Sequence, residues 1–144
     1  MKKINKSATI ILACAMMLMI VACGSKSYST VEEWYADNPA SQKSMEAMAK
    51  AESTDDLTIE FDIKENKIIY RYIYGVKIFG QSEEIDAAAK RMLDSGIEQS
   101  RSTYIQAINQ VAQSSKIDAS KISVVLEWYN PGASTPSYSL TITK

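Results

Sequence analysis

The side chains of this sequence with the most direct chemical potential are its carboxylates. Glu60 and Asp62 alternate along an apolar run, and Glu127 lies shortly before a predicted turn. Two acids that flank a glycosidic bond suffice for its hydrolysis. Charged residues also alternate with apolar ones on ordinary half-exposed strands. We therefore interpret these acids as surface residues, and we keep a small hydrolase acting through carboxylates alone as the alternative function.

Other side chains suited to catalysis or metal binding are scarce. The chain of 144 residues has no histidine, which is the commonest general base and metal ligand. Asp55 and Asp56 are adjacent but lack the ligand spacing of a calcium loop. The serines form no nucleophile-elbow motif. We therefore expect a protein that is not an enzyme and that holds no metal or cofactor.

A targeting signal precedes one of the two cysteines. Three lysines within the first six residues are followed by an apolar run over residues 8–21, which is too short for a comfortable transmembrane helix. The run ends in Ile20-Val21-Ala22-Cys23, which resembles the lipobox of bacterial lipoproteins. The resemblance implies cleavage before Cys23 and a diacylglyceryl group on its sulfur. A plain secretory signal, or a short membrane anchor with an incidental cysteine, is the alternative.

The signal divides the chain into three parts. We expect a signal peptide over residues 1–22, a lipidated tether over 23–29 and a single extracytoplasmic domain over 30–144. Two acyl chains would make membrane attachment effectively stable, whereas one chain is marginal. Loss of residues 1–22 removes three lysines, no acid and the other cysteine, Cys14, so the formal net charge moves from −1 to about −4. The mature domain then lacks the basic footprint of a nucleic-acid-binding protein.

Two helix signals open the domain. Residues 30–33, Thr-Val-Glu-Glu, have the form of a capping box, which satisfies two free N–H groups at a helix start. Asn38 is expected to cap a second helix, with Pro39 at its first position, where the missing N–H costs nothing. This second helix should extend to about residue 51.

Residues 57–74 have the alternation of a β-hairpin around a polar turn. A loop with an even number of residues pairs Phe61 with Tyr70 and places Glu60 opposite Arg71 as a cross-strand ion pair. We prefer this register because it pairs opposite charges and apolar residues. A three-residue loop with Asn66 in the left-handed region is the alternative, and it would turn every second-strand side chain to the other face.

The second half of the domain repeats the change from helix to hairpin. A short connection over residues 76–79 leads to Ser82, which is expected to cap a long helix ending near Ser114 with a weak point at Gly96. Alternating runs over 122–128 and 138–142 predict another hairpin. The expected fold is α+β, in the order helix, β-hairpin, long helix, β-hairpin, with a four-stranded, mainly antiparallel sheet packed against the helices.

This arrangement, with a terminal hairpin around residues 128–132 (Trp-Tyr-Asn-Pro-Gly), resembles small lipoproteins of Gram-positive bacteria that carry a domain of unknown function. The resemblance implies the fold and a location on the extracytoplasmic face of the cell membrane, but no activity. We expect a noncatalytic binding or protein-interaction module for a protein, a peptide or a cell-wall glycan. If binding uses aromatic stacking, the first candidates are Trp34, Tyr35, Trp128 and Tyr129, although aromatic residues at helical spacing usually lie in a core.

The lipobox makes a direct prediction about Cys23. Mass spectrometry of the N-terminal peptide from the membrane fraction should find a chain that begins at Cys23 and carries a diacylglyceryl thioether. Cys23→Ser should move the protein out of the lipid-modified fraction, because the oxygen of serine does not replace the thiolate as the nucleophile. An intact signal peptide or an unmodified Cys23 would contradict the prediction.

Overall fold

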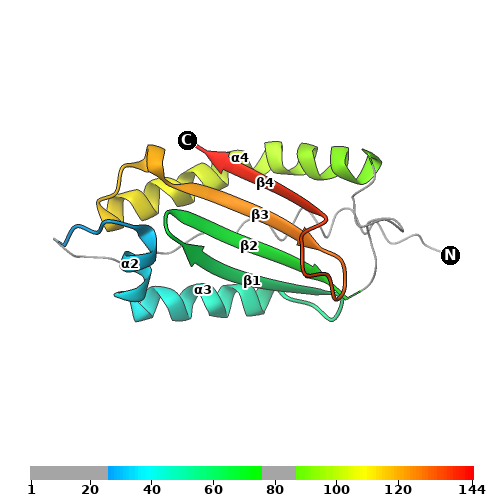
Figure 1. The fold of residues 1–144 in the computed structure, drawn as a ribbon, viewed down its shortest axis with the longest axis horizontal. Coiled ribbons are helices and arrows are strands. Elements are labelled where there is room, and N and C mark those ends of the chain that lie inside the picture. The colour runs from blue at the N-terminus through cyan, green and yellow to red at the C-terminus, as the bar shows by residue number, and fades with distance from the viewer. Residues whose placement is uncertain (1–25, 76–86) are drawn as a thin grey trace.

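The computed structural model describes residues 26–75 and 87–144. Three helices, one short 3-10 helix and four strands follow one another within these residues (Figure 1). The elements are α2 (Val31–Ala36), α3 (Pro39–Glu52), β1 (Leu57–Lys64), β2 (Lys67–Tyr74), α4 (Ala87–Ser115), η1 (Ala119–Lys121), β3 (Ser123–Tyr129) and β4 (Tyr138–Thr143). The predicted order of helix, hairpin, long helix and hairpin is confirmed, while the 3-10 helix was not foreseen.

The four strands form one sheet in the order β1-β2-β3-β4. The two hairpins are antiparallel, but β2 and β3 are parallel, with Tyr70 beside Leu126 and Tyr72 beside Trp128. The α+β class is therefore confirmed, and the sheet is mixed. Parallel neighbours require a long crossover connection, and α4 lies in the connection that brings the chain back to the start of β3.

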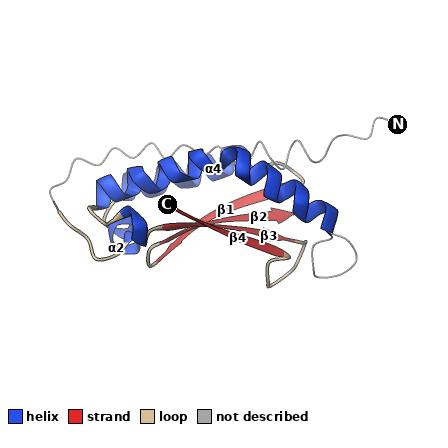
Figure 2. Cartoon of the chain, turned by 90° about the horizontal axis from the view of Figure 1, so that it is seen from above, coloured by secondary structure: helices blue, strands red, loops and turns tan. Residues whose placement is uncertain are grey.

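The described helices all pack on one face of the sheet (Figure 2). Side chains alternate between faces along each strand, so each strand sends half of its residues into the core under α2, α3 and α4. The other face, which we call the open face, carries Thr58, Glu60, Asp62, Lys64, Lys67, Ile69, Arg71, Ile73, Ser123, Val125, Glu127, Tyr129, Ser139, Thr141 and Thr143. Most of the open-face residues are partly or fully exposed.

The predicted register of the first hairpin is confirmed. Phe61 pairs with Tyr70 and Glu60 with Arg71 around a two-residue loop, Glu65-Asn66, so the three-residue alternative is wrong. The predicted ion pair is also wrong, because Arg71 binds Asp62 and Glu127 instead of Glu60. Parallel pairing places Glu127 directly beside Arg71 on β3, a neighbour that the hairpin alone does not reveal.

The turn of this hairpin also receives the start of α2. The N–H of Val31 donates to Asn66 Oδ1 at 3.0 Å, and the N–H of Glu32 donates to the carbonyl of Glu65 at 2.9 Å. In return, Glu32 Oε2 accepts the N–H of Glu65 at 2.8 Å. The first N–H groups of a helix lack partners within the helix, so these bonds both complete α2 and hold it against the sheet.

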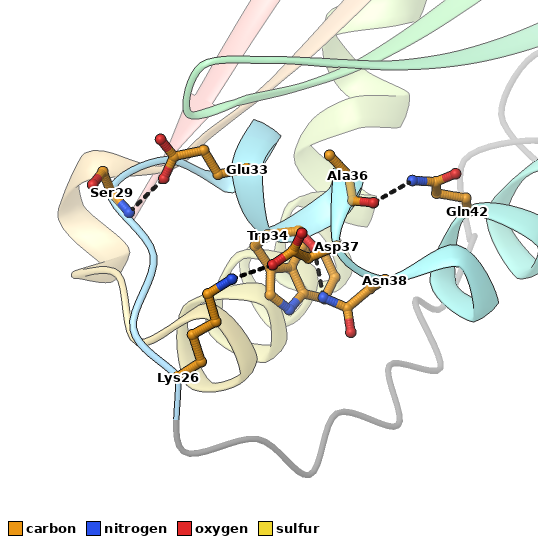
Figure 3. A network of polar contacts seen from close by, with 8 residues as sticks. All are labelled: Lys26, Ser29, Glu33, Trp34, Ala36, Asp37, Asn38 and Gln42. Atoms are coloured by element: carbon orange, nitrogen blue, oxygen red, sulfur yellow. Dashed lines mark hydrogen bonds and ion pairs between the residues drawn. The ribbon is translucent and has the colours of Figure 1, made fainter.

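The helix caps follow the sequence in part. Thr30 Oγ accepts the N–H of Glu33 at 3.2 Å, as a capping box requires, while the Glu33 carboxylate accepts from Ser29 (Figure 3). Pro39 occupies the first turn of α3 as predicted, but the Asn38 side chain does not cap α3. It donates instead to the carbonyl of Trp34 at 2.6 Å, because α2 ends within reach of its amide.

The long helix α4 is continuous through Gly96, which is buried, and it ends at Ser115, one residue beyond the predicted end. The predicted connection over residues 76–79 and the predicted cap at Ser82 lie outside the described residues. Within the described ranges, no helix combines the length and apolarity needed to cross a bilayer.

The turn predicts a stabilising substitution. Glu65 has φ of 54°, in the left-handed region that disfavours residues other than glycine. Glycine relieves this strain, which is worth about 1–2 kcal/mol, and its more flexible unfolded chain offsets about 0.4–1 kcal/mol of the gain. Glu65→Gly should therefore raise the free energy of unfolding by about 0.5–1 kcal/mol. The contacts of this residue with Glu32 persist, because they use only its main chain. Chemical denaturation measures the change. Glu65→Ala, the matched control, keeps the strain, so an equal gain from alanine would contradict this explanation.

Candidate functional site

Two of the four aromatic candidates lie in the core. Trp34 is 0% exposed and Trp128 is 1% exposed. Trp34 faces inward from α2. Trp128 stacks between Tyr72 and Tyr138, with ring centroids 5.5 Å from each. Neither indole can present a stacking surface to a ligand in this structure, which leaves Tyr35 and Tyr129 as candidates.

Tyr35 and Tyr129 are partly exposed and lie in different places. Tyr35, on α2, packs against Phe61 of β1 with ring centroids 5.7 Å apart. Partial burial raises the pKa of the Tyr35 hydroxyl, and the charges of Glu46 and Asp62 raise it further. Tyr129 lies on the open face, where its hydroxyl donates to Glu127 Oε2 at 2.8 Å. The structure therefore does not gather the four aromatic residues into one platform.

The centre of the open face is an ionic network around Arg71. The Arg71 guanidinium donates to Asp62 at 3.0 Å and to Glu127 at 3.2 Å, so one cation bridges strands β1 and β3. Partial burial lowers the Arg71 pKa, but the bonds to Asp62 and Glu127 outweigh it and the net shift is upward. Burial also raises the pKa of Tyr129, as does its bond to Glu127. The network keeps the charges of Arg71, Asp62 and Glu127 paired within the molecule.

This pairing bears on the carboxylates proposed for hydrolysis. Asp62 and Glu127 both bind the Arg71 guanidinium. To act as a pair on a glycosidic bond, both carboxylates would first have to break these ion pairs. Glu60 points to the same face but takes no part in the ion pairs of the described residues. Asp55 and Asp56 are exposed, and no group of three or more potential metal ligands occurs in residues 26–75 and 87–144.

A groove lies along the outer edge of β1, where α3 packs beside the strand. It has a volume of about 460 Å³ and is open to solvent; we call it the edge groove. Glu46, Ala49, Lys50 and Ser53 of α3 form one wall, and residues 58–61 of β1 form the other. Two carboxylates, Glu46 and Glu60, thus share a concave site.

Sequence reasoning missed the α3 side of this groove. Glu46, Lys50 and Ser53 follow one another at helical spacing and carry no motif, so their pattern is that of an ordinary solvated helix face. Only the packing of α3 beside β1 shows that they face a strand edge. Ser53 is the most informative of them, because its hydroxyl donates to the carbonyl of Ala49 at 2.8 Å and accepts the N–H of Ile59 at 2.9 Å.

A second polar cluster ties α4 to the edge strand β4. The Tyr138 hydroxyl donates to Asp94, and Lys90 pairs with Asp94 at 2.7 Å while lying 5.2 Å from the centre of the Tyr138 ring. The bond from Lys90, followed by that from Tyr138, lowers the pKa of Asp94. These contacts pack one end of the Tyr72–Trp128–Tyr138 stack, which gives them a structural role.

The fold and groove define a class of protein, an α+β fold whose described helices lie on one side of a four-stranded mixed sheet with a groove at one edge. A family model for a domain of unknown function, DUF4854, matches residues 31–134, and the chain belongs to this family. No curated protein and no solved structure matches the chain. The family therefore supports the expected domain of unknown function.

The raised pKa of Tyr129, caused first by burial and then by its bond to Glu127, predicts a pH dependence. A tyrosine whose pKa is raised in the folded state above the ordinary 10.0 keeps its proton where the unfolded chain has lost it. Its contribution to stability is present below the unfolded pKa and is lost as pH rises through the folded pKa. Tyr129→Phe should make the alkaline fall in the free energy of unfolding less steep, which denaturation at a series of pH values measures. An unchanged slope would contradict the prediction.

Proposed function

We propose that this protein is a lipid-anchored lipoprotein on the extracytoplasmic face of the cell membrane, whose domain binds a protein, a peptide or a cell-wall glycan without turning it over. The signal peptide is residues 1–22, Cys23 carries the diacylglyceryl anchor, residues 23–29 form the tether and residues 30–144 form the domain. Nucleic acid is not among the partners, since the mature chain is acidic.

The observation that carries this proposal is the edge groove. It is open and lies beside an edge strand, so it can accept a polymer that enters and leaves along its length. Its charged side chains, Glu46, Lys50 and Glu60, are exposed. Catalytic acids of glycosidases depend on a shielded setting that raises the pKa of one of them, and an open groove lined by solvated carboxylates suits recognition better than acid catalysis.

Contacts near the anchor support a short distance to the membrane. The N–H of Tyr28 donates to the carbonyl of Ser115 at the end of α4, and Lys26 pairs with Asp37 (Figure 3). Part of the proposed tether is thus held against the domain. The three residues from Cys23 to Lys26 span about 10 Å at most, so the end of the domain that carries α2 would lie close to the lipid headgroups.

The alternative is the small hydrolase that uses carboxylates alone. The specific observation in its favour is that Glu46 and Glu60 line the same groove. The two proposals differ in one measurable respect, which is whether a bound glycan or peptide is cleaved.

The experiment uses residues 23–144 with Cys23→Ser. This protein should be soluble and folded, because the described core contains no metal site or disulfide on which folding would depend, and it should bind a cell-wall fragment or peptide that remains intact by chromatography and mass spectrometry. Glu46→Gln and Glu60→Gln test the alternative, with Glu98→Gln on the exposed surface of α4 as the matched control. Turnover that disappears in the first two variants and persists in the third would overturn the noncatalytic proposal.

A further inference from the structure

The outer edge of β1 is only partly closed. In β1, the backbone N–H and C=O groups of even-numbered residues point toward β2, as the bond from the N–H of Gly75 to the carbonyl of Asp56 shows. The backbone groups of odd-numbered residues therefore point outward, away from β2. Leu57 exchanges both of these bonds with Thr54, and the N–H of Ile59 is taken by Ser53. The first part of the edge is therefore blocked by the end of α3 and the loop after it.

The backbone groups along the rest of the β1 edge are open to a new hydrogen-bond partner. Among residues 26–75 and 87–144, no hydrogen bond reaches the carbonyl of Ile59 or the outward N–H and C=O groups of Phe61 and Ile63. These groups alternate at the spacing of a β ladder, and those of Ile59 and Phe61 border the edge groove. An extended polypeptide has the donors and acceptors to satisfy them, whereas a glycan has no backbone of matching period.

The charges around the groove indicate what kind of polypeptide fits. Glu46 and Glu60 line it with a single cation, Lys50, and none of the three takes part in an ion pair among the described residues. Tyr35 packs against Phe61 at one end of the groove. Burial raises the pKa of its hydroxyl, and the negative charges of Glu46 and Asp62 raise it further, which shows that these acids lie near it. The excess of acid favours a partner with basic side chains.

The same acids oppose two of the registers in which a second copy of this chain could pair. Two β1 strands that pair antiparallel about Phe61 place Glu60 of each strand opposite Asp62 of the other, and two strands that pair about Glu60 place the two Glu60 side chains opposite each other. Like charges directly across a ladder are destabilising. Charged residues on an edge strand are a common defence against such self-association.

We propose that the edge groove binds an extended, basic segment of another polypeptide, which adds to β1 as a fifth strand. This inference rests on the proposed binding function and names its partner class. Backbone bonds to Ile59, Phe61 and Ile63 hold the segment in register, and its lysine or arginine side chains reach Glu46 and Glu60. Ser53 marks the end of the site, because its hydroxyl occupies the next position on the edge.

The test uses the full chain in detergent or lipid nanodiscs, with amide hydrogen exchange followed by NMR. The probe is a short synthetic peptide of alternating valine and lysine, blocked at both ends. Bound peptide should slow exchange at Phe61 and Ile63 by about tenfold or more, while Glu60 and Asp62, whose amides face β2, change little. A peptide methylated on alternate backbone nitrogens should lose this effect, because it cannot donate to the strand.

Charge is tested separately. The Glu46→Gln/Glu60→Gln double variant should bind the lysine peptide about tenfold more weakly, with Glu98→Gln as the unchanged control, and a peptide with glutamate in place of lysine should bind the original protein least. Equal binding of the lysine and glutamate peptides would contradict the inference that the partner segment is basic.

Further results would overturn the inference or the proposed function, and they separate the two. The fifth-strand inference is wrong if the lysine peptide does not bind, or if it binds without slowing exchange at Phe61 and Ile63. In either case, binding of cell-wall fragments would still support the proposed binding function. Slower exchange at those amides on concentrating the protein alone identifies a second copy as the occupant. Cleavage of the peptide removes the noncatalytic function itself.

Discussion

The parallel pairing of β2 with β3 is the constraint on which the rest of the structure depends. It joins two hairpins that are distant in sequence into one sheet, and it requires α4 in the crossover between them. It also sets Trp128 beside Tyr72 in the core and Glu127 beside Arg71 on the open face. One register therefore determines both the aromatic stack beneath α4 and the ionic network on the opposite side.

The two faces of the sheet are stabilised by different interactions. On the core side, large side chains such as Trp34, Trp128 and Tyr70 are almost fully buried, and removal of their apolar surface from water supplies the main stabilisation. On the open side, Arg71 pairs with Asp62 and Glu127, so charges that must stay near water are also neutralised locally. Such pairs contribute modestly when they are partly exposed; their clearer effect is to leave few unpaired charges at the centre of that face.

The sheet order also decides which strand can recognise a partner. Because β2 and β3 occupy the centre, β1 and β4 are left as edges, and an edge presents unpaired backbone groups. On β1, Ser53 and Thr54 satisfy the first outward groups, and the charged side chains of Glu60 and Asp62 discourage pairing with an identical strand. The position of α3 along β1 turns the remaining edge into a groove, which gives side chains of a partner something to contact.

The sequence by itself determined the local elements of this protein. The Thr30 cap, the proline at the start of α3 and the register of the first hairpin were all predictable, because each depends on residues close together in the chain and on the period of two that separates the faces of a strand. Family membership agrees with the expected domain of unknown function. The expectations for Cys23 and the membrane depend on residues 1–23, outside the described part of the chain.

Only the tertiary structure decided what these elements do together. Arg71 was expected to pair with Glu60 and instead binds Glu127, because the neighbour on β3 comes from a strand more than fifty residues away and no local pattern announces it. Trp34 and Tyr35 are adjacent in sequence, yet one is buried and the other lies beside Phe61 at the edge. The groove between α3 and β1 likewise arises from packing, since burial and neighbourhood are properties of the folded chain and not of any single segment.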